Sequence, residues 1–165
     1  MQSPPSAQHR LRIGRHSLPG QIYLLTTVTH RRQPFFANAE VARLAARTSA
    51  APESWQPSRC LCWVLMPDHW HGLIELADDA DLSATMQRFK GTLSHRIGQC
   101  AERRGPLWMR GFHDHALRDE ESLDAAARYI IANPVRAGLV DDVLDYPYWD
   151  AWFLDGNGEL AGYRG

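Results

Sequence analysis

The sequence lacks any apolar run of the roughly 18 residues that a membrane helix needs. Its first residues, Met1 to Arg15, are polar and basic and do not contain the apolar segment of a secretory signal. The chain has only 3 cysteines, at positions 60, 62 and 100, and this does not suggest a disulfide framework. We therefore expect a cytoplasmic protein with reduced thiols and no membrane partner. The 165 residues, 44% of them hydrophobic, suffice for one domain with a sizeable core.

The chain also lacks a dominant charge, because its net charge is only −1. Residues 1–118 nevertheless hold 15 Lys and Arg against 9 Asp and Glu, whereas residues 119–165 hold 3 against 10. The basic part can form a phosphate-binding face. Alternatively, its arginines are dispersed, solvated charges. The overall charge thus argues neither for nor against a nucleic-acid partner.

Hydrophobic patterning predicts secondary structure in the order β-α-β-β-α-β-α. Runs rich in β-branched or apolar residues predict strands over residues 21–30, 60–66, 69–76 and 107–117. Apolar residues at spacings of three and four predict helices over residues 39–48, 83–103 and 120–133. Asn38 suits the N-cap of the first helix, and Asp81 or Ser83 that of the second. Pro67 and Asp68 predict a hairpin turn between the second and third strands.

This order of elements is the split βαβ, ferredoxin-like pattern with one additional terminal helix. We therefore expect an α+β fold in which helices pack on an antiparallel sheet. The chain divides into a flexible basic arm at residues 1–18, a domain at residues 19–148 and a tail at residues 149–165. Three aromatic residues at this end are expected to pack back on the domain: Trp149, Trp152 and Phe153.

Two His-x-His motifs are candidate metal ligands. His69 and His71 share one strand face because side chains alternate along a strand. His113 and His115 form a second pair, and all four histidines together would suit a zinc site. Alternatively, Asp114 would accept a hydrogen bond from a histidine ligand, through the ring nitrogen that does not bind the metal. Ordinary surface histidines also fit so short a pattern, but we favour the first pair because a buried strand and a tight turn fix its position.

Tyr129 and Asn133 lie four residues apart in the last predicted helix, so we expect them to be neighbours on one helix face. An Asn oxygen suits a divalent cation, and a hydroxyl one turn away would then lie beside that cation. The alternative is a tyrosine packed on the sheet and an asparagine that caps the helix before Pro134.

A tyrosine near a bound metal has a specific chemical use. With a pKa of about 10, only about 0.1% of a free tyrosine is ionised at pH 7. It still acts as a nucleophile when a divalent ion polarises the phosphate that it attacks. The products would be a phosphotyrosyl bond and a free 3′-OH. Because the phosphotyrosyl bond keeps the energy of the phosphodiester bond that it replaces, a later hydroxyl could reseal a cut DNA strand without ATP.

Several segments together resemble a known family: residues 63–73 (WVLMPDHWHGL), Leu107-Trp108 with Gly111-Phe112, and residues 129–140 (YIIANPVRAGLV). From about Pro19 to Tyr148 the chain resembles the REP-associated tyrosine transposases, relatives of the IS200-type transposases in the HUH single-tyrosine superfamily. The resemblance implies an HUH fold with His69 and His71 as metal ligands and Tyr129 as the nucleophile that forms a 5′-phosphotyrosine. Asn133 stands where the IS200 branch often has a glutamine ligand. The implied cofactor is Mg²⁺ or Mn²⁺, and Mn²⁺ should work at least as well because histidine is an unusual Mg²⁺ ligand.

The resemblance also implies a partner, single-stranded DNA from palindromic REP-like hairpins with a short conserved tetranucleotide at the stem foot. Candidate phosphate contacts are Arg31, Arg32, Arg88, Lys90, Arg96, Arg103, Arg104 and Arg110, with Arg10, Arg12 and Arg15 in the N-terminal arm. Core packing is favoured over base stacking for Trp70, Trp108 and Phe112. A hairpin-binding protein that does not cut, built on a ferredoxin-like platform, and a structural zinc protein are the alternatives. We expect a monomer, with a dimer as the alternative.

Overall fold

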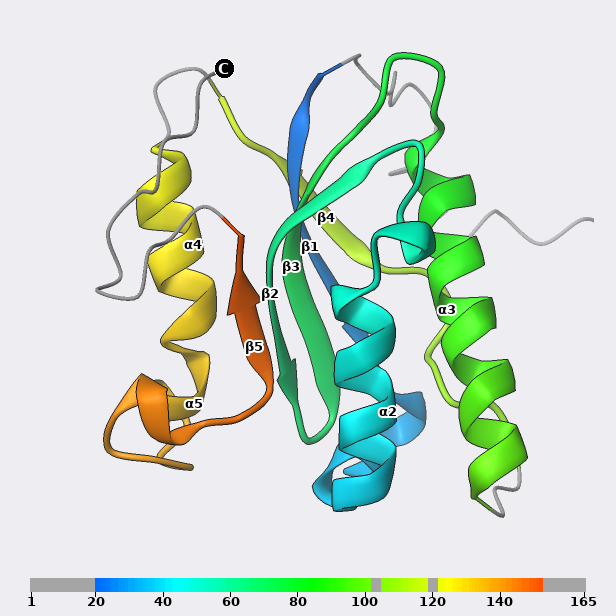
Figure 1. Cartoon of the computed structure of the whole chain (residues 1–165), viewed down its shortest axis with the longest axis vertical. Helices are drawn as coiled ribbons and strands as arrows, with labels where there is room; N and C mark the ends of the chain where they lie inside the picture. Colours follow the sequence, from blue (N-terminus) through cyan, green and yellow to red (C-terminus); the bar gives the residue numbers. More distant parts are fainter. Residues whose placement is uncertain (1–19, 102–104, 119–121, 153–165) are drawn as a thin grey trace, which may run out of the picture.

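The computed structural model describes residues 20–101, 105–118 and 122–152 and shows a five-stranded antiparallel sheet in the order β4-β1-β3-β2-β5 (Figure 1). The strands are β1 (Ile22–Val28), β2 (Arg59–Met66), β3 (His69–Glu75), β4 (His113–Ala116) and β5 (Trp149–Ala151). The helices are α2 (Ala39–Ala50), α3 (Leu82–Cys100), α4 (Leu123–Ile131) and α5 (Asn133–Arg136). The first four strands have the ferredoxin-like arrangement, so the predicted fold class is confirmed.

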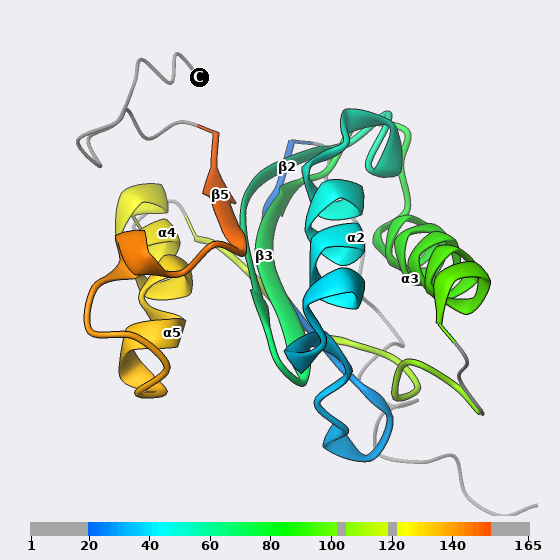
Figure 2. The same ribbon diagram turned by 60° about the horizontal axis from the view of Figure 1, so that its bottom comes forward.

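Two helix layers enclose the sheet. Helices α2 and α3 lie on one face, and α4 and α5 lie on the other (Figure 2). The predicted caps are present: the Asn38 side chain accepts hydrogen bonds from two backbone N–H groups of α2, and the Asp81 side chain accepts one from Ala84 of α3. None of the described helices has the length and apolar character needed to cross a membrane.

The face beneath α2 and α3 holds an aromatic core. The Trp55 ring stacks on Phe89 with centroids 4.2 Å apart and on Trp70 with centroids 5.3 Å apart. Trp70 is completely buried, Trp108 is nearly so, and the half-buried Phe112 packs against the same cluster. The expected core packing of these residues is confirmed, and burial of this much aromatic surface stabilises the sheet that carries the histidines.

Gly72 allows β2 and β3 to approach each other beside the histidine pair. A Cβ atom at this position would lie 2.5 Å from the Trp70 ring and 2.7 Å from the Cys62 carbonyl oxygen. The register between the two strands also shifts between Cys60 and Cys62. The residue after His71 therefore has to be a glycine for the strand pair to keep this geometry.

The face beneath α4 holds a smaller aliphatic core. Val64, Met66 and Leu73 from the sheet pack against Ile130 and Ile131 of α4. Along β1, the residues that face this side are only half-buried, whereas those that face α2 and α3 are buried. The α4 face is therefore partly open, and this is the face that carries the candidate site.

Some predicted elements differ from the structure. In the predicted tail, Trp149 packs against the domain as expected but belongs to the edge strand β5, whereas Trp152 is exposed rather than packed, and Phe153 lies outside the described residues. The last predicted helix, over residues 120–133, ends at Ile131, and α5 is an additional short helix that the sequence analysis did not predict, with Pro134 in its first turn. The predicted strand at residues 107–117 is shortened to β4, with only a single bridge at Trp108.

Candidate active site

Both histidines of the first pair point to the α4 side of the central strand β3. His69 lies opposite Val28 of β1 and Met66 of β2, and His71 lies opposite Thr26 and Val64. His71 is buried, with 7% of its surface exposed, whereas His69 is half-buried. The sheet thus fixes one imidazole in the interior and leaves the other nearer to solvent.

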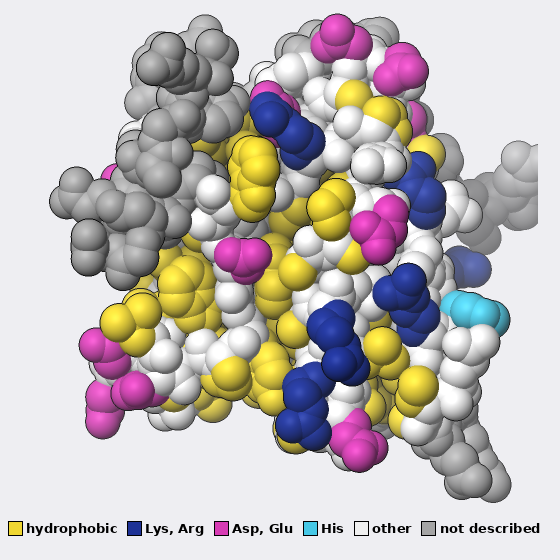
Figure 3. Space-filling model, in the orientation of Figure 1, with side chains coloured by type: hydrophobic (Ala, Val, Ile, Leu, Met, Phe, Trp, Pro, Cys, Tyr) yellow, Lys and Arg dark blue, Asp and Glu magenta, His cyan; other side chains and the backbone are white. Residues whose placement is uncertain are grey.

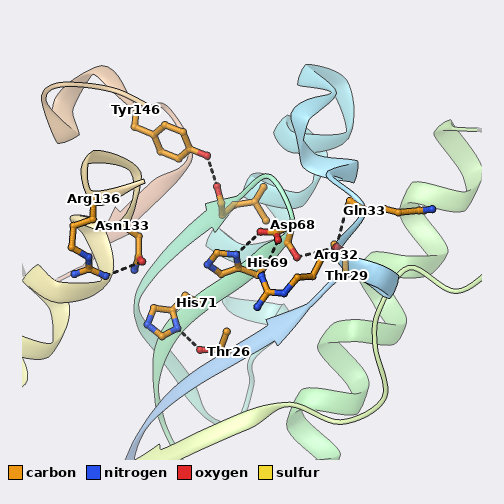
Figure 4. Close-up of polar contacts among 11 residues, drawn as sticks. Thr26, Thr29, Arg32, Gln33, Asp68, His69, His71, Asn133, Arg136 and Tyr146 are labelled. Atoms are coloured by element: carbon orange, nitrogen blue, oxygen red, sulfur yellow. Dashed lines mark hydrogen bonds and ion pairs between the residues drawn. The ribbon is translucent and has the colours of Figure 1, made fainter. Parts of the chain in front are cut away.

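A neighbouring side chain holds Nδ1 of each imidazole (Figure 4). Nδ1 of His71 lies 2.5 Å from the Thr26 hydroxyl oxygen, and Nδ1 of His69 lies 2.7 Å from the Asp68 carboxylate. These contacts leave Nε2 of each ring as the nitrogen for a metal ion. A fixed Nδ1 is the usual support of a metal-bound histidine. The sequence analysis did not assign this role to Asp68 or Thr26. The role of Asp68 could have been predicted because it precedes His69 in the sequence, whereas the role of Thr26 could be found only from the register between β1 and β3.

The environment keeps His71 uncharged at neutral pH. Burial and the nearby charges of His69 and Arg136 lower the pKa of His71 to about 4, although a hydrogen bond with the Leu25 backbone opposes this shift. A neutral imidazole is the form that binds a metal. Partial burial alone would raise the pKa of Asp68, but hydrogen bonds from His69 and Arg32 hold it below its usual value. Asp68 is therefore an ionised acceptor at neutral pH.

A strained turn places Arg32 against Asp68. Nη1 of Arg32 lies 3.0 Å from the Asp68 carboxylate. Arg31 and Arg32 have φ angles of 54° and 53°, in the left-handed region that residues other than glycine seldom adopt. The buried Thr29 hydroxyl stabilises the turn, because it lies within hydrogen-bonding distance of the carbonyl oxygens of Asp68 and Gln33.

Tyr129 extends from α4 toward the histidine pair. Its ring centroid lies 6.3 Å from that of His71 at an interplanar angle of 67°, and 55% of its surface is exposed. Tyr146 approaches the same part of the sheet, but its hydroxyl donates a hydrogen bond to the Leu65 carbonyl oxygen, and burial and Tyr148 raise its pKa to about 12. Of these two tyrosines, Tyr129 is therefore the better-placed candidate nucleophile.

Asn133 is the first residue of α5 and remains a neighbour of Tyr129, since its Nδ2 lies 3.5 Å from the Tyr129 carbonyl oxygen. Its Nδ2 donates to the Ile130 carbonyl oxygen at 2.9 Å, and its Oδ1 accepts from Arg136 at 2.9 Å. The oxygen predicted to bind a metal is thus engaged by a guanidinium group. The sequence analysis also did not identify Arg136, because only its position in the segment at residues 129–140 marked it.

The second histidine pair lies two strands from the first. His113 on β4 pairs with Thr26, which pairs in turn with His71. Across the described parts of the chain, which include all four histidines, no group of three or more His, Cys, Asp or Glu residues is gathered for metal binding. The four histidines are therefore not brought together as the zinc alternative required.

The predicted phosphate contacts separate into three groups. Three donate hydrogen bonds within the protein: Arg88 to the Gln56 carbonyl oxygen, Lys90 to the Met109 and Gly111 carbonyl oxygens, and Arg96 to the Thr48 hydroxyl. Arg31, Arg32 and Arg110 are exposed near the end of β1, where the Met109 N–H donates to the Val28 carbonyl oxygen, although Arg32 also donates to Asp68. The remaining five lie outside the described residues: Arg10, Arg12, Arg15, Arg103 and Arg104. On the side shown in Figure 3, Lys and Arg side chains lie over α2, α3 and the upper end of the sheet rather than in one patch.

A ferredoxin-like sheet with a histidine pair that faces a helical tyrosine is the arrangement expected of a single-tyrosine transposase. Comparison with known families agrees: residues 18–133 match the IS200-like transposase model. The chain therefore belongs to the IS200-like transposase family, a family of DNA strand-transfer enzymes.

Its relatives include REP-associated tyrosine transposases. The Escherichia coli K12 protein of that name is 30% identical over 94 residues, which cover 56% of this chain and 54% of the relative. A Haemophilus influenzae relative is 27% identical over 139 residues, 78% of each chain. A solved REP-associated tyrosine transposase bound to a REP hairpin superimposes with a TM-score of 0.65 at 25% identity, over 82% of this chain and 79% of that one.

Proposed function

We propose that the protein is a metal-dependent enzyme that nicks single-stranded DNA and rejoins it, with Tyr129 as the nucleophile. The observation that carries this proposal is the separation of 6.3 Å between the ring centroids of Tyr129 and His71, which come from different elements. Nucleophilic attack on a phosphodiester requires a hydroxyl beside a group that can hold a polarising cation. Family membership supports the same reaction class.

His69 and His71 would hold the divalent ion through Nε2. The donor set fits this role, because both Nδ1 atoms are engaged and His71 is neutral at physiological pH. When bound, a divalent ion supplies positive charge that makes the phosphorus more electrophilic. We expect Mn²⁺ to support the reaction at least as well as Mg²⁺.

In the proposed reaction, the Tyr129 oxygen attacks the phosphorus and forms a new P–O bond while the bond to the 3′ oxygen breaks. The phenol proton passes to solvent, and the leaving oxygen takes up a proton to become a 3′-OH. The 5′ end stays on the protein as a phosphotyrosine. Attack by a 3′-OH on the same phosphorus reverses these bond changes, so the strand is resealed without ATP.

Asn133 completes the proposed ligand set only if Arg136 releases its Oδ1. Ligation predicts that Asn133→Ala weakens Mn²⁺ binding in the absence of DNA. If Asn133 only anchors Arg136, the Mn²⁺ affinity stays unchanged and DNA cleavage alone becomes slower. Calorimetric titration of Mn²⁺ into both proteins distinguishes the two roles.

The proposed substrate is single-stranded DNA from palindromic, REP-like hairpins. This assignment is supported by the REP hairpin bound to the solved relative and by the names of the curated relatives. Arg31, Arg32 and Arg110 are the described candidates for phosphate contacts, because they are exposed near the strand end that borders His69. We further propose a monomer, which light scattering on the DNA-free protein tests.

The test is a covalent-adduct assay with labelled hairpin DNA and Mn²⁺. The wild-type protein should yield an adduct that survives denaturing electrophoresis, and Tyr129→Phe should abolish it. Tyr146→Phe is the matched control, because it removes a phenol hydroxyl already bonded to Leu65, and it should retain the adduct. An adduct that persists in Tyr129→Phe would reassign the nucleophile. Tight hairpin binding with no adduct in any protein would favour a binding protein that does not cut.

A further inference from the structure

Arg136 lies directly over the ring of Tyr129. Its guanidinium carbon is 3.9 Å from the ring centroid, a cation–π contact. Nη1 donates to the Tyr129 carbonyl oxygen at 3.0 Å, and Nη2 donates to Oδ1 of Asn133 at 2.9 Å. The guanidinium is therefore anchored at two points while its plane contacts the phenol.

Tyr129 needs such support because 55% of its surface is exposed. An exposed tyrosine ordinarily samples several rotamers, and each of them places the hydroxyl elsewhere. In the described structure its ring has Arg136 on its face and His71 toward its edge. The arginine contact thus restricts the ring on the face that Arg136 covers.

Arg136 reaches Tyr129 across the junction between α4 and α5. Helix α4 ends at Ile131, Ala132 keeps right-handed helical backbone angles, and α5 follows with Pro134 in its first turn. The Arg136 side chain extends from α5 to the Tyr129 carbonyl oxygen near the end of α4. Asn133 connects the two helices, since its Nδ2 donates to Ile130 while its Oδ1 accepts from Arg136, and Figure 4 shows the two side chains directed at each other.

We propose that Arg136 is a positioning residue that fixes the nucleophile Tyr129 beside the histidine pair, with Asn133 as its anchor. This inference rests on the proposed function, because it assumes that Tyr129 attacks DNA. A positioning role makes a specific prediction: loss of Arg136 slows the chemical step on bound DNA but hardly changes DNA affinity. A direct phosphate contact would instead weaken binding and lower its dependence on salt.

The test compares Arg136→Ala and Arg136→Lys with Arg128→Ala. Arg128 is the matched control, since it is an exposed arginine of α4 that pairs with Asp124. The rate of adduct formation is measured in a single turnover with saturating hairpin DNA and Mn²⁺. DNA affinity is measured by fluorescence anisotropy at several salt concentrations in a Tyr129→Phe background, where no cleavage interferes.

We expect Arg136→Ala to slow the saturated rate by about 10- to 100-fold, as a displaced reacting group does. Its DNA affinity should stay within about threefold of the parent, with an unchanged salt dependence. Arg136→Lys should be intermediate, because an ammonium retains the charge but cannot stack while donating to both anchors. Arg128→Ala should react at about the wild-type rate.

A wild-type saturated rate in Arg136→Ala would overturn the inference. A full rate at saturating DNA, combined with a weaker salt dependence of DNA binding, would also overturn it. The slope of log affinity against log salt concentration would then fall by about 0.7, the value for one lost phosphate contact on a single strand. If Arg136→Ala melts early, Arg136→Lys decides, and full activity in that variant would also refute a role that depends on the guanidinium plane. Absence of any adduct with the wild-type protein would refute the proposed function itself, and the inference with it.

Discussion

The two halves of the candidate site are built differently. The sheet half, His69 and His71, belongs to a central strand that has a hydrogen-bonded neighbour on each side. The helix half, Tyr129, is largely exposed, and a side chain from the following short helix restrains it. The sheet half suits the proposed fixed metal ligation, whereas the exposure of the helix half would allow DNA to reach the proposed nucleophile and the tyrosine to carry a covalently bound strand.

The supporting residues differ in the same way. On the sheet side, Thr26 and Asp68 each hold one imidazole nitrogen. On the helix side, Arg136 depends on Asn133 and on a backbone carbonyl oxygen. Substitutions on the two sides should therefore fail in different assays: sheet-side changes in metal binding, and helix-side changes in the rate on bound DNA.

The largest effect is expected on the sheet side, from His71→Ala. Removal of the buried imidazole takes away one of the two proposed histidine ligands, so both Mn²⁺ binding and adduct formation should be lost. Calorimetry and the adduct assay measure the two properties. His113→Ala is the control, because it removes an exposed histidine that lies two strands away. A normal adduct yield from His71→Ala would exclude this residue from the metal site.

A smaller loss is expected when only the support of His69 changes. Asp68→Asn removes the negative charge that His69 and Arg32 share. Loss of such a supporting group typically lowers metal affinity or activity by about 10- to 100-fold. The Mn²⁺ dependence of the adduct rate measures the effect, with the exposed Asp78→Asn as control. Equal Mn²⁺ requirements in both variants would show that Asp68 does not orient His69.

The rigidity of the sheet half can be tested through Gly72. Gly72→Ala should destabilise the protein by about 1–3 kcal/mol, because the new methyl group overlaps the Trp70 ring and a β2 carbonyl. Gly91→Ala is the matched control, since nothing lies within 4 Å of the added atom. In a helix this exchange is expected to stabilise by up to about 1 kcal/mol. Urea unfolding measures the free energy of unfolding of each variant. Equal values for Gly72→Ala and Gly91→Ala would contradict the close approach at Gly72.

The smallest effect concerns Tyr146, which links the segment after α5 to β2. Tyr146→Phe removes its hydrogen bond to the Leu65 carbonyl oxygen and should cost about 1 kcal/mol of stability at pH 8. Because the folded-state pKa is raised to about 12, this contribution is complete below the unfolded value near 10 and is lost as the pH rises through 12. The difference between wild type and variant should therefore shrink between pH 10 and 12. A constant difference in urea unfolding across that range would contradict the assignment.

Local patterns in the sequence determined much of this protein. Alternation along a strand placed His69 and His71 on one face, and the caps at Asn38 and Asp81 were readable from residue type. The order of the first four strands followed from the sequence of elements. These features depend on backbone geometry and side-chain preferences within a few residues, so a single sequence is enough to specify them.

Other features were decided only by the tertiary structure. The Thr26 contact with His71 depends on the register between β1 and β3, and the Arg136 contact with Tyr129 depends on α5, a short helix that the sequence analysis did not predict. Residues 149–151 read as a tail but form β5 because the edge of β2 offers backbone partners. Such contacts join residues that are distant in the chain, and their geometry is fixed when the two helix layers and the sheet pack together.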